Sequence, residues 1–77
     1  MNNKRVARAR LWGMGIRACG ICGERIEAFS DATIDHIVPL GRWGSNQMSN
    51  LQLAHYSCNN AKGNQLRYAP PKEAAHD

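Results

Sequence analysis

Residues 34–62 read IDHIVPLGRWGSNQMSNLQLAHYSCNNAK, and this stretch contains most of the side chains that can bind a metal ion or transfer a proton. The apolar run around Asp35 and His36 predicts a β-strand, and the proline and glycines that follow it predict a loop. Residues 50–54 predict a second strand that pairs with the first, and the polar segment 59–67 favours a short helix. The sequence therefore predicts an α+β fold in the order strand, loop, strand, helix.

The length and the cysteine count indicate a small domain held by a metal ion. A chain of 77 residues forms a core that is only marginally stable without a metal or disulfide crosslink. The three cysteines are an odd number and cannot all pair in intramolecular disulfides. The apolar piece 11–16 is short and interrupted by glycine, so it matches neither an export signal nor a membrane helix. We therefore expect a reducing cytoplasm, where thiolates bind metal.

We expect the whole chain to form one domain with three parts. Residues 1–17 contain a basic helix, from Asn3 to about Trp12, which the following glycines end. Residues 19–67 form the metal-stapled core with the two strands and the second helix. Residues 69–77 contain two prolines and no core-forming pattern, so they are expected to be a flexible tail.

Positive charge is concentrated at the start of the chain, whose formal net charge is +4 at pH 7. Glu24 is the first acidic residue, and five basic residues precede it: Lys4, Arg5, Arg8, Arg10 and Arg17. Such a cluster favours a polyanionic partner. The alternative is an exposed helix face that only keeps the protein soluble, and for a charge run taken alone we slightly prefer this alternative.

Two ligand pairs indicate a structural zinc site. A C-x2-C pair and an H-x2-C pair supply three sulfurs and one imidazole nitrogen, which match tetrahedral zinc. The four candidate ligands are Cys19, Cys22, His55 and Cys58. They leave no open coordination position. The ion would therefore join the tight turn at residues 19–23, here called the knuckle, to the end of the second strand. The alternative is that the histidine is a surface residue and the cysteines are small buried apolar side chains.

A second set of polar residues has the composition of a catalytic site: Asp35, His36, Asn50 and Asn59. Carboxylate and amide oxygens suit Mg²⁺ or Mn²⁺, and an imidazole can accept a proton from water near pH 7. Each residue also has a structural alternative, namely a buried histidine, an ion-paired aspartate, or an asparagine in a turn or helix cap. Adjacent residues of a flat strand point to opposite faces, so we expect the strand to bend or begin at Asp35.

These residues resemble those of the HNH endonuclease family, which has the ββα-metal or His-Me finger fold. The matching text is CGIC, IDHIVPL and SNLQLAHYSCNNAKGN, in that order, within residues 19–64. The resemblance implies that His36 is the general base, oriented by a backbone carbonyl of the second strand. Asp35 and Asn59 would hold a catalytic Mg²⁺ or Mn²⁺, while Asn50 would tie the loop through backbone hydrogen bonds. Asn59 stands where the motif often has histidine, and His55 stands where it often has cysteine.

The resemblance also implies the substrate and the products. We expect cleavage of DNA to 5′-phosphate and 3′-hydroxyl ends, in a protein similar to small phage and bacterial HNH proteins. The residues expected to contact DNA phosphates are Lys4, Arg5, Arg8, Arg10, Arg42 and Lys62. One active site favours nicking, so a double-strand break would need a dimer or a protein partner. The alternative function is a zinc-stapled module that binds nucleic acid without cutting it. Trp43 can stack on a base or pack on the core, and we expect packing.

Overall fold

The protein folds as two helices around a two-stranded antiparallel sheet. The computed structural model describes residues 3–63 and residue 65. Its main elements are α1 (Asn3–Gly13), β1 (Ala32–His36), β2 (Leu51–His55) and α2 (Tyr56–Lys62), with short 3-10 turns at Phe29–Asp31, Leu40–Arg42 and Met48–Asn50. The predicted α+β class and element order are confirmed. The predicted tail, residues 69–77, lies outside the described residues.

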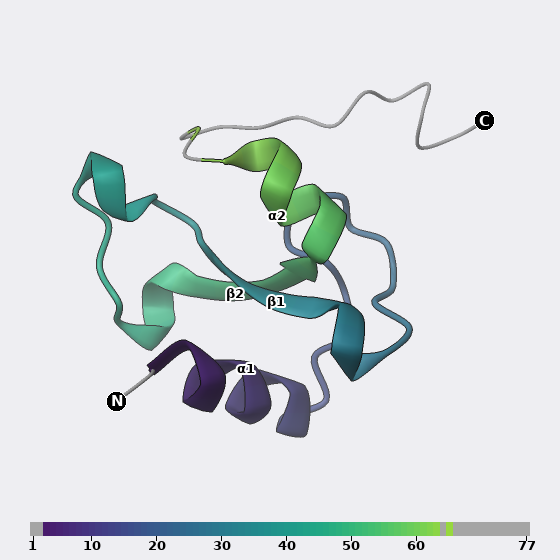
Figure 1. The fold of residues 1–77 in the computed structure, drawn as a ribbon. Helices are drawn as coiled ribbons and strands as arrows, with labels where there is room; N and C mark the ends of the chain where they lie inside the picture. Colours follow the sequence, from purple (N-terminus) through teal and green to yellow (C-terminus); the bar gives the residue numbers. More distant parts are fainter. Residues whose placement is uncertain (1–2, 64, 66–77) are drawn as a thin grey trace.

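The sheet lies between α1 and α2, which cover its opposite faces (Figure 1). In the antiparallel register, Ala32 pairs with His55 and His36 pairs with Leu51. Because side chains alternate along a strand, every second residue of β1 faces α1 and the others face α2. One face therefore contributes to the core, while the other is available for polar groups.

The face toward α1 is the hydrophobic core. Ala7 and Leu11 lie one helical turn apart on α1 and join Ile34, Leu51 and Leu53 in one buried cluster. This spacing of four residues places both α1 side chains on the same side of the helix. Burial of a side chain such as Leu53 contributes about 2 kcal/mol to stability. In the described part of the chain, no helix has the length and apolar character needed to span a membrane.

The second helix begins three residues earlier than the predicted segment 59–67. The backbone N–H of Tyr56 donates to Asp31 Oδ1 at 3.3 Å, so a residue 25 positions away acts at the helix start. No Ser, Thr, Asp or Asn stands at position 55 to signal this start in the local sequence. Gly63, with φ of 56°, ends the helix, and its N–H donates to Asn59 O.

Candidate functional site

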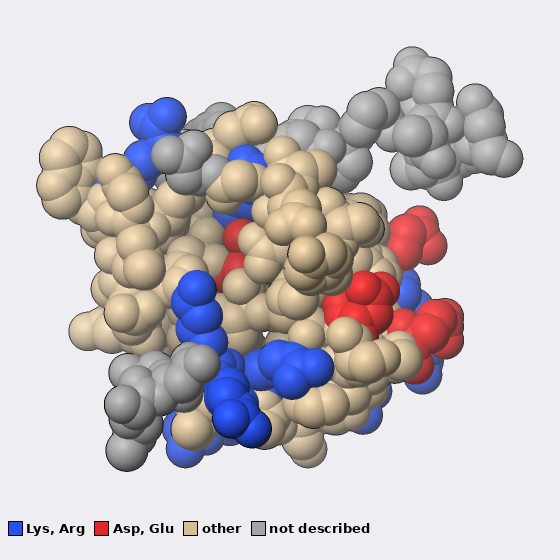
Figure 2. Space-filling view, in the orientation of Figure 1, with Lys and Arg blue, Asp and Glu red and all other residues tan. Residues whose placement is uncertain are grey.

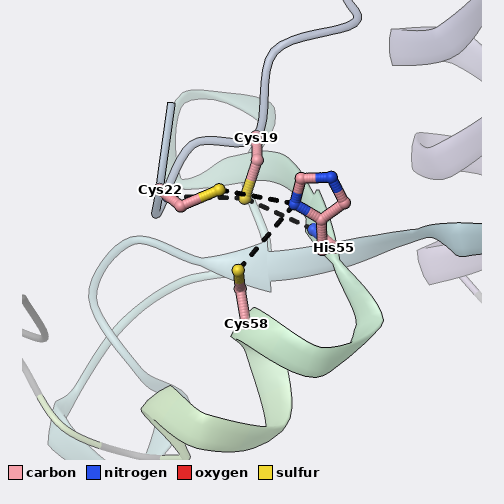
Figure 3. Close-up of side chains that lie close together, drawn as sticks. All are labelled: Cys19, Cys22, His55 and Cys58. Carbon is pink, nitrogen blue, oxygen red and sulfur yellow. Dashed lines mark hydrogen bonds between the residues drawn. The ribbon is translucent and has the colours of Figure 1, made fainter. Parts of the chain in front are cut away.

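The four predicted zinc ligands converge at one end of the sheet (Figure 3). Their ligand atoms all lie within 4.8 Å of one another, and they come from the knuckle, β2 and α2. Cys22 Sγ is 3.5 Å from His55 Nδ1, and Cys58 Sγ is 3.8 Å from the same nitrogen. A zinc tetrahedron with Zn–S of about 2.3 Å and Zn–N of about 2.0 Å has edges of roughly 3.5 to 3.8 Å. The Cys3His set therefore has the ligand chemistry of a zinc site, and its two sulfur–nitrogen distances are close to the edge of a zinc tetrahedron.

His55 is oriented for metal binding by its second ring nitrogen. Nε2 lies 3.0 Å from the backbone carbonyl of Arg25. A carbonyl only accepts hydrogen bonds, so Nε2 carries the proton and Nδ1 keeps its lone pair toward the sulfurs. Burial opposes the charged imidazole, but the Arg25 carbonyl and the Cys19 sulfur outweigh it and raise the pKa of His55.

The cluster favours one thiolate and resists a second. Burial by itself would raise the pKa of Cys19, but N–H groups of Cys22, His55 and Ile21 donate to its sulfur and lower the pKa from 9.0 to about 7. Burial together with the nearby Cys22 and Cys19 sulfurs raises the pKa of Cys58 to about 12. A divalent cation can replace the Cys58 proton and relieve the repulsion among the sulfurs.

On the α2 face, Asp35 forms a buried ion pair with Lys62. Lys62 Nζ donates to Asp35 Oδ2 at 2.7 Å, and the two side chains are only 6% and 4% exposed. Gln52 Nε2 donates to the same Oδ2 at 2.8 Å, so neither of these bonds uses Oδ1. The ammonium also donates to His36 O at 2.8 Å. Lys62 was expected to approach a phosphate, but in this structure its charge is directed inward to Asp35.

Asn59 lies on the same face as Asp35. Its Nδ2 donates to Thr33 Oγ1 at 3.1 Å and to Ile34 O at 2.9 Å. Thr33 precedes Asp35 by two strand residues, or about 7 Å, and Asn59 precedes Lys62 by one helical turn, or about 5 Å. Asp35 and Asn59 thus lie on the same side of β1, between the strand and α2. The alternate carbonyls of Ile34 and His36 both accept bonds from α2 along the free edge of β1.

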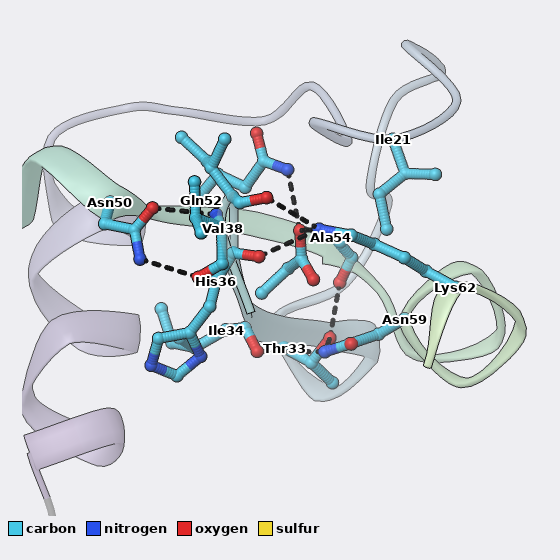
Figure 4. Close-up of polar contacts among 12 residues, drawn as sticks. Ile21, Thr33, Ile34, His36, Val38, Asn50, Gln52, Ala54, Asn59 and Lys62 are labelled. Carbon is cyan, nitrogen blue, oxygen red and sulfur yellow. Dashed lines mark hydrogen bonds and ion pairs between the residues drawn. The ribbon is translucent and has the colours of Figure 1, made fainter. Parts of the chain in front are cut away.

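His36 faces the opposite side of β1. Its Nε2 lies 2.7 Å from Asn46 Oδ1, and its ring points away from Lys62 and Asn59 (Figure 4). Asp35 and His36 are the last two residues of β1, so the strand ends there and does not begin there as expected. The expected backbone-carbonyl partner in β2 is replaced by the side chain of Asn46. No spacing rule in the sequence relates Asn46 to His36, so this contact was missed.

Asn50 closes the loop between the strands with its side chain. Its Oδ1 accepts from Val38 N at 2.8 Å, and its Nδ2 donates to Val38 O at 2.9 Å and to Ser45 O at 2.8 Å. These three bonds join the start and the end of the loop that contains Asn46. Asn50 therefore ties the loop through backbone groups.

A cleft of about 390 Å³ lies at the free edge of β1 between the two helices. Its walls include Lys4, Arg5 and Arg8 from α1 and Tyr56, Asn59 and Asn60 from α2. Figure 2 shows basic side chains gathered over α1 on this face, while acidic side chains gather at the right of the view. The cleft therefore places three of the predicted phosphate-binding residues beside Asn59. Asp35 and His36 are not among its lining residues.

The other predicted phosphate contacts lie outside this cleft. Arg10 lines a smaller hollow of about 170 Å³ together with Asn46 and Met48. Arg42 is exposed in the loop between the strands. Trp43 follows it and is 97% exposed, so the prediction that it packs on the core is wrong. Gln52 was missed as a partner of Asp35, although the cross-strand register of the two strands pairs these residues directly.

Comparisons with known proteins agree with the arrangement of motifs. The family model described as HNH endonuclease matches residues 19–65, which is more than half of the chain. The match covers both zinc-ligand pairs, both strands and α2. Searches of curated proteins and of solved structures gave no match.

Proposed function

The chain belongs to the HNH endonuclease family, and from that membership we propose that it hydrolyses phosphodiester bonds in DNA with the help of a divalent metal ion. The observation that carries the proposal is the position of Asn59. This residue lies on the polar face that holds Asp35 and also in the wall of the cleft lined by Lys4, Arg5 and Arg8. A phosphate held by the basic residues would therefore lie next to Asn59, one of the two predicted metal ligands, while Asp35 lies behind the cleft lining.

His36 is proposed to supply the base from the side of β1 opposite Asp35, so the reacting phosphate must extend beyond the cleft and past the end of the strand. Because Asn46 Oδ1 accepts from Nε2, that nitrogen carries the proton and Nδ1 is left to accept one from the attacking water. The bonds of Asn50 hold the loop that contains Asn46, so they fix the tautomer and the orientation of the ring from a distance. Asn50 is accordingly a positioning residue.

Asp35 and Asn59 are proposed to hold the divalent ion. A carboxylate and an amide oxygen fit Mg²⁺ or Mn²⁺, and Asp35 Oδ1 takes no part in the bonds from Lys62 and Gln52 to that carboxylate. When bound, such an ion would neutralise charge that develops on the phosphate and on the departing 3′ oxygen. Without the ion, the Lys62 ammonium balances the charge of the Asp35 carboxylate. Binding of the divalent ion therefore requires the ammonium either to share the carboxylate with the ion or to move away from it.

Basic residues of α1 provide affinity without reading sequence. Lys4, Arg5 and Arg8 line the cleft, and Arg8 is fixed by bonds to Ala32 O and Phe29 O and by the Phe29 ring 3.8 Å away. Phosphate contacts of this kind weaken as salt concentration rises. Zinc is proposed at the Cys3His cluster, which implies a reducing cytoplasm because its three thiols must stay unoxidised.

One observation favours a second function, a nucleic-acid-binding module without catalysis. The Lys62 ammonium already balances the charge of Asp35, as it would in a purely structural ion pair. In that case the basic cleft would carry the whole function, and no ion would need to bind Asp35 or Asn59.

Plasmid nicking separates the two functions. Zinc-loaded protein is incubated with supercoiled plasmid and Mg²⁺ or Mn²⁺, and we expect conversion to the nicked form. His36→Ala should slow this conversion by about 100-fold or more. His76→Ala is the matched control because His76 lies outside the family match, and it should nick at the wild-type rate. Gel retardation by a wild-type protein that leaves the plasmid intact would refute the nuclease and support the binding module.

A further inference from the structure

Trp43 occupies a position that neither burial nor backbone preference explains. Its side chain is 97% exposed, and its backbone has φ of 66° and ψ of 25°, in the left-handed region. Bulky side chains rarely adopt this conformation because Cβ crowds the backbone. It is the one non-glycine residue with positive φ in the described part of the chain. Strain at an exposed aromatic residue indicates a requirement outside the folded chain.

The turn that presents Trp43 is firmly built. Arg42 N and Gly44 N both donate to Pro39 O at 2.9 Å, and Trp43 N donates to Leu40 O at 3.2 Å. A side chain at Gly44 would collide with Val38 O, so this glycine lets the chain pass close to its own backbone. Asn50 bonds to Val38 on one side of the turn and to Ser45 on the other. The exposed indole is therefore held by a turn that several hydrogen bonds stabilise.

The surroundings of Trp43 suit a polyanion better than a protein surface. Arg42 precedes it, and no acidic residue occurs between Asp35 and Glu73. The same loop contains Asn46, which contacts His36. Trp43 lies seven positions after His36, which limits the distance between their Cα atoms to about 25 Å even in a fully extended chain. A nucleic acid strand that passes His36 can thus reach the indole.

We propose that Trp43 stacks on the base of an unpaired nucleotide, and that the protein prefers DNA that is single-stranded or gapped near the bound phosphates. The inference rests on the proposed function for its nucleic-acid partner. An indole covers the face of a base, and that face is accessible only where the base is not stacked inside a duplex. A single aromatic ring at a turn, without a groove around it, recognises such a face and not a base sequence.

The test compares binding and stability in the same variants. Anisotropy titrations use the full-length, zinc-loaded protein with a labelled 20-nucleotide single strand, the same strand in a blunt duplex, and a gapped duplex. No further divalent ion is added, so that binding is read without cleavage. Trp43→Gly should bind the single strand and the gapped duplex about 5-fold to 100-fold more weakly and the blunt duplex less than 2-fold more weakly. Trp43→Phe should keep most of the affinity, because its ring still stacks.

Trp43→Gly should weaken DNA binding without lowering the thermal stability of the protein. Trp43→Gly removes the left-handed strain, so its melting temperature should equal or exceed that of the wild type. Leu40→Ala is the matched control: it removes an exposed apolar side chain from the same turn and should change neither binding nor preference by more than 2-fold. The inference is overturned if Trp43→Gly loses affinity equally for all three DNAs, keeps full affinity, or melts well below the wild type.

These outcomes distinguish the inference from the function on which it rests. A wild-type protein that nicks plasmid while Trp43→Gly retains its affinity for single strands removes only the stacking role. A wild-type protein that binds none of the DNAs removes both.

Discussion

The ion pair between Asp35 and Lys62 gives the sharpest prediction about the polar face. Lys62→Met keeps the apolar stem and removes the ammonium, which lies 2.7 Å from Asp35 Oδ2 and 2.8 Å from His36 O. The Asp35 carboxylate then stays buried without its countercharge, and His36 O loses a donor. Breaking a buried pair on one side costs about 3 to 5 kcal/mol of unfolding free energy. For a domain of this size, the melting temperature should fall by more than about 12 °C.

A double-mutant cycle isolates the pair. Asp35→Asn combined with Lys62→Met removes both charges, and this double variant should recover most of the stability that Lys62→Met loses. Thermal unfolding by circular dichroism, at fixed zinc loading, measures all four proteins. Lys72→Met makes the same chemical change outside the family match and serves as the control. If Lys62→Met melts within 2 or 3 °C (about 0.5 kcal/mol) of the wild type, the buried Asp35 carboxylate does not need Lys62 as its countercharge and the reasoning is refuted.

Magnesium extends the same experiment to the proposed ion site. If Lys62 and the ion compete for Asp35, then Mg²⁺ should raise the melting temperature of Lys62→Met more than that of the wild type. The double variant lacks the carboxylate and should show no such increase. An equal response to Mg²⁺ in every variant would contradict the assignment of Asp35 as a metal ligand.

Three further predictions concern the zinc cluster, the loop and the cleft. Cys58→Ser should lower the amount of bound zinc, measured by metal analysis, and should unfold the domain. In the wild type, the loss of zinc to a chelator should increase as the pH falls below 7. The reason is that Cys19, with a pKa of about 7, and His55, with a raised pKa, both take up protons as the pH falls. Unchanged zinc content in Cys58→Ser would exclude it as a ligand. Asn50→Ala removes three hydrogen bonds and should lower the unfolding free energy by about 1 to 3 kcal/mol in urea titrations, and a loss below about 0.5 kcal/mol would show that the loop is held otherwise. Arg5→Ala should reduce the slope of log affinity for DNA against log salt by about 1, whereas an unchanged slope would place Arg5 outside the phosphate interface.

The sequence predicted those features that depend on local spacing. The apolar run around Asp35 and His36, with the proline and glycines after it, located β1 and β2. The paired C-x2-C and H-x2-C spacing predicted four ligands that do converge. The start of α2 was not predictable in this way, because its partner Asp31 is distant in the chain. The exposure of Trp43 was also missed, since an aromatic residue among apolar neighbours normally indicates packing.

The contacts of the candidate catalytic residues could not be predicted from local spacing in the sequence. Asp35 and His36 face opposite sides of β1, as in a regular strand, so the strand start that we expected at Asp35 to bring them together does not occur. Their partners depended on how distant elements dock: Lys62 reaches Asp35 because α2 crosses the strand in one particular register, and Asn46 reaches His36 because Asn50 closes the loop. Neither docking leaves a periodic signal in the sequence.

The polar face also indicates what a zinc ion at the Cys3His cluster would contribute to this fold. Of the seven residues of α2, Lys62 alone is buried, so the helix contributes no fully buried apolar side chain to the core. Seven residues are too few for a helix that is stable by itself, and the buried pair with Asp35 offsets its own desolvation at best. A metal ion at the Cys3His cluster would therefore contribute much of the attachment of α2, because Cys58 lies within this helix and His55 immediately precedes it. A structural ion at that end would let the α2 face of β1 keep the polar groups that a hydrophobic core would exclude.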